Sequence, residues 1–219
     1  MSGLTLIIGN KNYSSWSLRP WIFLKYHQLE FNEIRVPLFT ETTNEELSEY
    51  NSDFKVPILK DGELVVWDSL SILEYISEKY LGNKGWPSNI KSRSVARSVS
   101  SEMHSSFFNI RNELPMNCRK KFNNIELSKD AECEVERIKY LWRMCQNNYG
   151  NKGGWLFGDF SIVDAMFAPI ALRLDGYSIP VDNETQKYIK QVLDHPYIIE
   201  WVEAGKIEKE IIGEDEVEI

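Results

Sequence analysis

The sequence predicts a mixed α/β fold in the first third of the chain, followed by an all-helical second part. Three observations support this prediction. Short apolar segments alternate with helical ones up to about residue 82, a stretch rich in helix breakers follows, and the later segments carry helical periodicity with little strand signal. With 219 residues, of which 42% are hydrophobic, the chain is long enough to bury a sizeable core.

The first elements alternate between strand and helix. Short apolar or alternating segments predict strands, and apolar residues that recur at helical spacing predict helices. Thr43, with Glu46 three residues later, fits a capping box at the start of the second helix. The expected order is a strand at 4–8, a helix at 16–28, a strand at 32–36 and a short helix at 43–50.

A hairpin and one more helix complete this part. Strand segments at 57–60 and 64–67 flank Asp61-Gly62, and an Asp-Gly pair readily adopts the positive φ angles of a tight hairpin turn. A helix is expected at 69–81. The order β-α-β followed by α-β-β-α predicts a thioredoxin-like sheet with helices on both faces.

A breaker-rich segment, 82–87, separates the two parts of the chain. We therefore expect a first domain at 1–82, a linker at 83–91 and an all-helical domain at 92–219. The acidic end at 208–219 is expected to be a loosely held tail. The helices of the second domain are predicted at 92–114, 127–149, 161–174 and 184–194.

Composition argues against several classes of protein. The net charge of −8, without a long basic run, disfavours nucleic acid as a partner. No apolar run approaches the roughly 20 residues of a membrane span, and the N-terminal residues lack the basic region of a signal peptide. Cys118, Cys133 and Cys145 are an odd number without a Cys-x-x-Cys pair, which favours a reducing cytoplasm and no metal site.

The first of three candidate site motifs runs from Tyr13 to Arg19 and carries Ser14, Ser15 and Ser17. It lies where the first strand has ended and the first helix begins. A hydroxyl at that point, next to free backbone N–H groups and the positive end of the helix dipole, stabilises an anion. The alternative is that Ser14 or Ser15 merely caps the helix.

The second and third motifs are Lys55-Val56-Pro57 and Asp68-Ser69. Because proline cannot donate a hydrogen bond within a sheet, the backbone of Val56 is expected to remain available to an extended peptide. Asp68 and Ser69 open a helix, so their side chains and the first free N–H groups converge on one point. Simple capping by Asp68 is again the alternative.

These motifs and the helical second part resemble a cytosolic glutathione S-transferase, and the resemblance covers nearly the whole chain. Ser14-Ser15-Trp16-Ser17-Leu18-Arg19 is similar to the Ser-Ser-Cys-Ser-x-Arg of zeta-like bacterial transferases, with Trp16 in place of their Cys. Two later stretches, 102–105 and 114–117, resemble bacterial family members. The resemblance implies a homodimer that uses glutathione as cosubstrate, with a role in detoxification.

The resemblance also implies roles for the motifs. Ser14 would hold the glutathione thiolate, with Ser15 and Ser17 as supports and Tyr13 as the rival. Val56, before a cis Pro57, would pair its backbone with the cysteinyl unit. Lys55 would contact the glycyl carboxylate at one end of the tripeptide. Asp68 and Ser69 would contact the γ-glutamyl group at the other end.

Simple energetics show that a hydroxyl is sufficient for this task. Lowering a thiol pKa from about 8.5 by about two units requires about 2.7 kcal/mol. One hydrogen bond to a charged acceptor supplies roughly 1.5 to 3 kcal/mol and a helix terminus about 0.3 to 1 kcal/mol. No protein base is therefore needed.

The resemblance places the second-substrate pocket against the helical domain. His104, Phe108 and Arg111 are spaced to share one helix face, although His104 and Phe108 equally fit an ordinary core or interface. Arg173 is a candidate to meet an acidic co-substrate, and Tyr13 adjoins the same region. Ser161 and Asp164 form a Ser-x-x-Asp capping box, for which we expect a structural role.

Three functions are considered. The first is a glutathione transferase that adds the thiolate to a small apolar electrophile, or reversibly to a conjugated double bond as an isomerase of the maleylacetoacetate type does. The second is a thiol-disulfide reductase, which would need a Cys where Ser14 stands. The third is a non-catalytic glutathione-binding or interaction module, which would not need the three motifs.

Overall fold

The computed structural model describes residues 3–50, 52–150 and 153–217. Within these residues the sheet has four strands in the order β2-β1-β3-β4. β1 (Leu4–Ile8) is parallel to β2 (Asn32–Arg35) and antiparallel to β3 (Ile58–Asp61), which is antiparallel to β4 (Leu64–Trp67). The β3–β4 hairpin turns at Gly62, whose φ of 60° suits glycine, and the predicted hairpin is thus confirmed.

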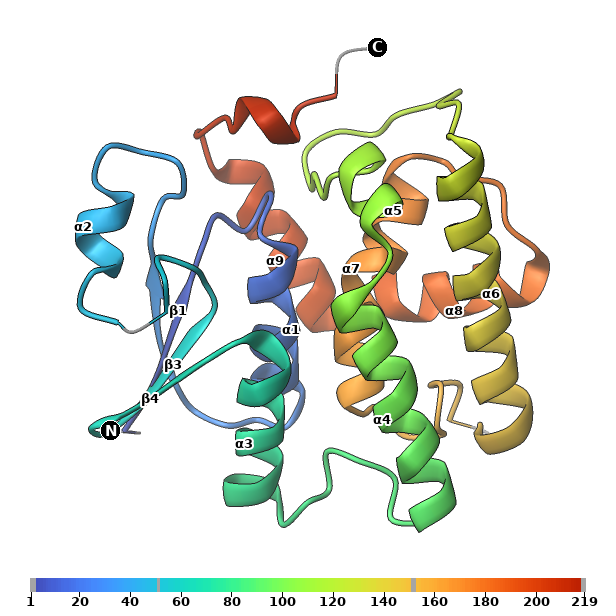
Figure 1. Cartoon of the computed structure of the whole chain (residues 1–219), viewed down its shortest axis with the longest axis horizontal. Coiled ribbons are helices and arrows are strands. Elements are labelled where there is room, and N and C mark those ends of the chain that lie inside the picture. The colour runs from blue at the N-terminus through green and yellow to red at the C-terminus, as the bar shows by residue number, and fades with distance from the viewer. Residues whose placement is uncertain (1–2, 51, 151–152, 218–219) are drawn as a thin grey trace.

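The helices of the sheet part are α1 (Ser15–Tyr26), α2 (Thr43–Leu47) and α3 (Ser69–Leu81). Figure 1 shows α2 on one side of the sheet and α1 and α3 on the other, toward the helices of the second part. The second part contains α4 (Ile90–Ser105), α5 (Phe108–Glu113), α6 (Lys129–Tyr149), α7 (Ile162–Gly176), α8 (Asn183–Leu193) and α9 (Pro196–Ile207). The predicted thioredoxin-like sheet followed by a helical region is confirmed.

The two faces of β1 enter different cores. Leu4, Leu6 and Ile8 belong to the large core, whereas Ile7 packs with Leu47 of α2 in a small cluster on the other face. This follows from the alternation of side chains along a strand. The large core extends through α1 and α7, which pack together, so one apolar interior joins the sheet to the helices.

The start of α2 differs from the prediction. Thr42, rather than Thr43, is the N-cap residue, and its hydroxyl donates to Glu46 Oε1 at 2.7 Å. The Thr43 hydroxyl instead donates to the Pro37 carbonyl at 2.7 Å and accepts from the Thr40 N–H at 2.9 Å. The expected capping box between Thr43 and Glu46 is therefore wrong, and the helix ends at Leu47 rather than at residue 50.

The helix predicted at 92–114 is two helices. α4 begins at Ile90, because the Asn89 side chain accepts from the N–H groups of Lys91 and Ser92. The chain then breaks at Phe107, which has a left-handed conformation with φ 65°. The prediction that His104, Phe108 and Arg111 share one helix face is thus wrong, since His104 lies on α4 and the other two lie on α5.

The C-terminal region differs most from expectation. Helix α9 was not predicted, although Pro196 occupies its first turn and His195 caps it. The segment 208–217 is not a loose tail, because it is anchored by hydrogen bonds to the rest of the molecule. The Glu208 carboxylate accepts from the backbone N–H groups of Lys11 and Asn12 at 2.8 and 3.0 Å.

The predicted capping box at the start of α7 is present. Asp164 is fully buried, and its Oδ2 accepts from both the N–H and the hydroxyl of Ser161 at 3.0 Å. Its Oδ1 accepts from the Leu156 N–H and the Tyr188 hydroxyl, each at 3.0 Å. One carboxylate therefore satisfies four buried donors and ties α7 to α8 and to the preceding loop.

Candidate active site

A cavity of about 680 Å³ opens beside the N-terminus of α1. Its walls come from the β1–α1 loop, the segments around residues 38–44 and 54–56, helices α5 and α7, and the C-terminal segment. The lining residues are Tyr13, Ser14, Ser15, Trp16, Leu38, Phe39, Thr40, Thr43, Asn44, Phe54, Lys55, Val56, Arg111, Met116, Arg173 and Asp215.

The three serines have different positions at this helix end. Ser14 is the N-cap residue of α1, and its hydroxyl donates to Ser17 Oγ at 2.7 Å. Ser17 is fully buried behind it and also accepts from the Gly9 N–H at 3.1 Å. A Cβ at Gly9 would lie 2.5 Å from Leu38 Cδ1, so any side chain there would displace Leu38. Ser14 thus faces the cavity, with Ser17 fixed beneath it.

Ser15 connects the same helix end to α7. Its Oγ accepts a hydrogen bond from Arg173 Nη2 at 3.2 Å, while Arg173 Nε donates to the Leu114 carbonyl at 2.7 Å. The buried Arg173 is thereby held at the cavity wall beside the serines.

The second motif lies at the same cavity. The Val56–Pro57 peptide bond is cis, and Lys55 and Val56 both line the cavity. Among the described residues, the backbone N–H and C=O of Val56 find no hydrogen-bond partner. Lys55 forms an exposed ion pair with Asp53 at 2.9 Å. The open backbone expected at Val56 is therefore within the same cavity as Ser14.

The third motif lies next to the cavity, at the N-terminus of α3. Asp68 Oδ1 accepts from the N–H groups of Leu70 and Ser71 at 3.1 and 3.0 Å, and its Oδ2 lies 2.9 Å from His104 Nε2. Burial alone would raise the pKa of Asp68, but the hydrogen bonds from His104 and Ser71 outweigh burial and hold it below its ordinary value. Asp68 is thus an ionised cap that is also tied to α4.

Trp16 stands between two cations. The guanidinium carbon of Arg19 lies 4.2 Å from the centre of its ring, and that of Arg111 lies 4.6 Å from it. His104 meets the same ring edge-on with centroids 5.4 Å apart. Trp16 therefore joins the first helix to the residues of α4 and α5.

Three arginines concentrate positive charge at this site. Within the described part of the chain, Arg19, Arg111 and Arg173 form no ion pair with a carboxylate. Burial lowers the pKa of all three and brings that of Arg173 to about 10. Repulsion from Arg111 adds to this for both Arg19 and Arg173. Such a site favours an anion.

Tyr13 is committed to the C-terminal segment. Its hydroxyl donates to Glu216 Oε1 at 2.5 Å and accepts from Arg119 Nη2. Burial and the bond to Glu216 raise the pKa of Tyr13, and the Ile212 backbone and the charge of Arg119 only partly offset them. The Tyr13 hydroxyl is therefore a weaker acid than a free phenol, and both of its partners are protein groups.

Comparison with known proteins agrees with this geometry. Residues 13–79 match a family model described as the glutathione S-transferase N-terminal domain. Over 66 residues the chain is 38% identical to a dichloromethane dehalogenase from Methylophilus leisingeri, a match that covers 29% of this chain and 25% of that protein. The matched segment thus spans about a quarter of that relative's length.

Solved structures match over nearly the whole chain. A glutathione transferase homologue from Burkholderia, crystallised with bound glutathione, gives a TM-score of 0.68 at 20% identity and covers 94% of this chain and 99% of its own. A diazinon-metabolizing glutathione S-transferase from the silkworm Bombyx mori gives a TM-score of 0.73 at 18% identity. That match covers 93% of this chain and 97% of the silkworm protein. The chain has the glutathione S-transferase fold.

Within this glutathione S-transferase fold, the sequence-derived candidates divide into two groups. Those that line the cavity are Tyr13, Ser14, Ser15, Lys55, Val56, Arg111 and Arg173. Those that do not are Ser17, Pro57, Asp68, Ser69, His104 and Phe108. Of the second group, Ser17 hydrogen-bonds to Ser14, which lines the cavity. Ser69 and Asp68 bond to Arg19 and His104, both of which contact the ring of Trp16 in the cavity wall, whereas Phe108 is 65% exposed.

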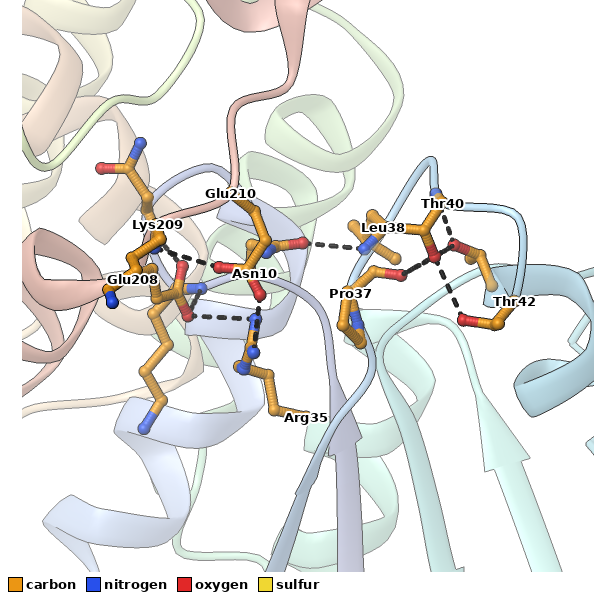
Figure 2. Close-up of polar contacts among 12 residues, drawn as sticks. Asn10, Arg35, Pro37, Leu38, Thr40, Thr42, Glu208, Lys209 and Glu210 are labelled. Carbon is orange, nitrogen blue, oxygen red and sulfur yellow. Dashed lines mark hydrogen bonds and ion pairs between the residues drawn. The ribbon is translucent and has the colours of Figure 1, made fainter.

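The sequence did not point to the contribution of the C-terminal segment. Asp215 lines the cavity, and the neighbouring Glu208 and Glu210 hold the segment against the sheet part. Figure 2 shows Glu208 and Glu210 beside Arg35, whose Nη2 donates to Glu210 Oε1 at 2.8 Å. It also shows Asn10, whose Oδ1 accepts from the Leu38 N–H at 2.8 Å. Only the acidic composition of this segment was visible in the sequence.

The described residues lack two further features. No helix combines the length and apolarity that crossing a bilayer requires. No group of three or more His, Cys, Asp or Glu side chains is arranged to hold a metal ion.

Proposed function

We propose that the chain is a glutathione transferase of the zeta-like, serine type, in which the Ser14 hydroxyl stabilises the glutathione thiolate. The observation that carries this proposal is that Ser14, at the N-terminus of α1, faces one cavity together with the unpaired backbone of Val56. A thiol peptide that adds to Val56 as an extra strand would present its sulfur to the helix end.

The hydrogen bonds around Ser14 support its role. The Gly9 N–H donates to Ser17 Oγ, and a hydroxyl hydrogen rotates to suit its partners. Ser17 is therefore able to donate to Ser14 while Ser14 donates to a thiolate, and successive bonds in such a chain strengthen one another. The positive end of α1 adds to this effect.

The remaining peptide contacts follow the same proposal. The Val56 N–H and C=O pair with the cysteinyl unit, and Lys55 meets the glycyl carboxylate. Asp68 and Ser69 meet the γ-glutamyl end, which is zwitterionic. In this scheme residues 1–82 bind glutathione, residues 92–219 line the electrophile pocket, and 83–91 link the two. The enzyme acts as a homodimer in the cytoplasm.

The unpaired arginines favour an acidic second substrate over a purely apolar one. Arg111 and Arg173 line the cavity without carboxylate partners among the described residues, and a buried charge is stabilised by a counter-charge. This favours the second form of the activity, a cis-trans isomerisation of the maleylacetoacetate type. There the thiolate adds to a conjugated double bond, the resulting single bond rotates, and the thiolate leaves again.

Calorimetry with glutathione, followed by turnover assays, tests this proposal. The assays use chlorodinitrobenzene as an apolar electrophile, a dihaloalkane because a relative is a dichloromethane dehalogenase, and maleylacetone as an acidic isomerisation substrate. We expect glutathione uptake and turnover of at least one substrate. Binding without turnover of any of them would favour a non-catalytic glutathione-binding module, and no binding would contradict the proposal.

A further inference from the structure

Asp215 introduces a negative charge into a cavity whose other charged lining residues are cations. It belongs to a short 3-10 helix, Gly213–Asp215, in the C-terminal segment. Of the described residues that line the cavity, Asp215 carries the sole carboxylate, whereas Arg111, Arg173 and Lys55 carry positive charges. No hydrogen bond to the Asp215 side chain occurs within the described part of the chain, so its charge is not used to anchor the segment.

The position of Asp215 is fixed by its neighbours. The next residue, Glu216, accepts from the Tyr13 hydroxyl and from Asn117 Nδ2 at 3.2 Å, and pairs with Lys120. Arg119 also donates to the Glu210 carbonyl at 2.8 Å, on the other side of the short helix. Figure 1 shows this segment crossing the end of the molecule between the sheet part and the helices. Asp215 is therefore held at the cavity by a segment anchored before and after it.

The charges in the cavity act on a ligand in opposite directions. Burial raises the pKa of Asp215, and the positive charge of Arg173 lowers it, so the two side chains interact electrostatically. A ligand carboxylate near Arg173 is attracted by the guanidinium and repelled by the Asp215 carboxylate. The cavity lining thus carries the positive charges of Lys55, Arg111 and Arg173 and the negative charge of Asp215, which partly offsets their attraction for an acidic ligand.

We propose that Asp215 sets the charge selectivity of this cavity by opposing its arginines, so that its loss strengthens the binding of an electrophile with two carboxylates much more than that of an uncharged one. The inference rests on the proposed glutathione transferase function and specifies the substrate class of that same site. Asp215 is a specificity-determining residue in this scheme, and it takes no part in holding the thiolate.

Calorimetry with three glutathione conjugates tests the inference. S-methylglutathione carries no charge on its substituent, S-(carboxymethyl)glutathione carries one carboxylate, and S-(dicarboxyethyl)glutathione carries two. In the wild type we expect both carboxylate conjugates to bind more tightly than S-methylglutathione. In Asp215→Asn we expect the affinity for the dicarboxylate to rise about tenfold, while that for S-methylglutathione changes less than about twofold.

Glu214→Gln is the matched control, because it removes the same charge one residue away, from an exposed side chain that does not line the cavity. It should leave all three affinities unchanged. Binding of S-methylglutathione by each variant shows that the site is intact, and Asp215→Ser provides the same charge change if the asparagine variant does not fold.

Two outcomes would overturn the inference, and they differ in what else they contradict. If the wild type binds S-methylglutathione but the preference among the conjugates is the same in Asp215→Asn, the inference alone is wrong. If the wild type binds none of the three conjugates, the proposed function fails and the inference fails with it.

Discussion

Arg19 donates a hydrogen bond from Nη1 to Ser69 Oγ at 3.2 Å, and this bond joins the middle of α1 to the first turn of α3. Arg19 is almost completely buried, and its guanidinium carbon lies 4.2 Å from the centre of the Trp16 ring. The first and third sequence motifs are therefore one connected unit. A change in Arg19 is transmitted to Ser69, which in our proposal contacts the γ-glutamyl end of glutathione.

Arg19→Lys tests this connection. Lysine keeps the charge but loses the planar group that both stacks on Trp16 and reaches Ser69. We expect the KM for glutathione to rise about tenfold, equivalent to about 1.4 kcal/mol, with a smaller change in kcat. Steady-state kinetics measure both. If Ser69→Ala and Arg19→Lys together change KM by the full product of the single effects, the two residues act independently and the connection is wrong.

Ser14→Ala separates a catalytic role of this residue from helix capping. If Ser14 holds the thiolate, its loss raises the pKa of the bound glutathione thiol by about one to two units, since one charge-assisted hydrogen bond is removed. Ultraviolet titration of the thiolate in the enzyme complex measures this pKa. Tyr13→Phe is the control and should leave it unchanged. A depressed thiol pKa that survives in Ser14→Ala moves the role to Ser15, Ser17 or Tyr13.

Glu208→Gln tests the anchoring of the C-terminal segment. The Glu208 carboxylate accepts from two backbone N–H groups of the β1–α1 loop, and glutamine offers a single acceptor oxygen to these two donors. We expect the free energy of unfolding to fall by about 1 to 2 kcal/mol and the segment to become more sensitive to proteolysis. Urea unfolding and limited proteolysis measure these effects. Equal sensitivity in wild type and variant would show that other contacts hold the segment.

The parts of the fold that depend on local signals were predictable. The buried strand Leu4–Ile8 and the turn at Asp61-Gly62 depend on residues next to each other in the chain, and both occur as expected. The break at Phe107 was not predictable, because this position adopts a left-handed conformation without glycine or asparagine. Periodicity alone did not predict helix α9, although the Pro at its first position is a usable local signal.

The sequence predicted those parts of the site that depend on one local motif, and it did not predict the contacts between motifs. Ser14 and Val56 reach the cavity because each stands at the end of its own element. The contacts between motifs, such as His104 with Asp68 and Arg173 with Ser15, join segments far apart in the sequence. The same is true of Glu216 and Tyr13, which is why the C-terminal segment was expected to be loose. Sequence spacing does not reveal which distant side chains meet.

Asp164→Ala is expected to impair folding rather than glutathione chemistry. The substitution leaves four buried donors from Leu156, Ser161 and Tyr188 without an acceptor. We expect a loss of about 3 to 5 kcal/mol in the free energy of unfolding, or no folded protein. Urea unfolding measures the stability, and calorimetry measures glutathione binding. A stable variant that has lost affinity for glutathione would contradict the structural role.

The ionisation of Asp164 also makes stability depend on pH. Burial raises its pKa from 3.8 to about 6, and the four hydrogen bonds oppose this without cancelling it. The folded state therefore binds a proton more tightly than the unfolded state, so this group's contribution to stability increases as pH falls from about 7 toward about 4 and is then constant. Asp164→Asn removes the titration and is the variant with which the wild type is compared. Between pH 7 and pH 5 we expect the wild type to gain about 1 kcal/mol relative to Asp164→Asn in urea unfolding. A constant difference between the two proteins over this range would show that Asp164 has an ordinary pKa in the folded state.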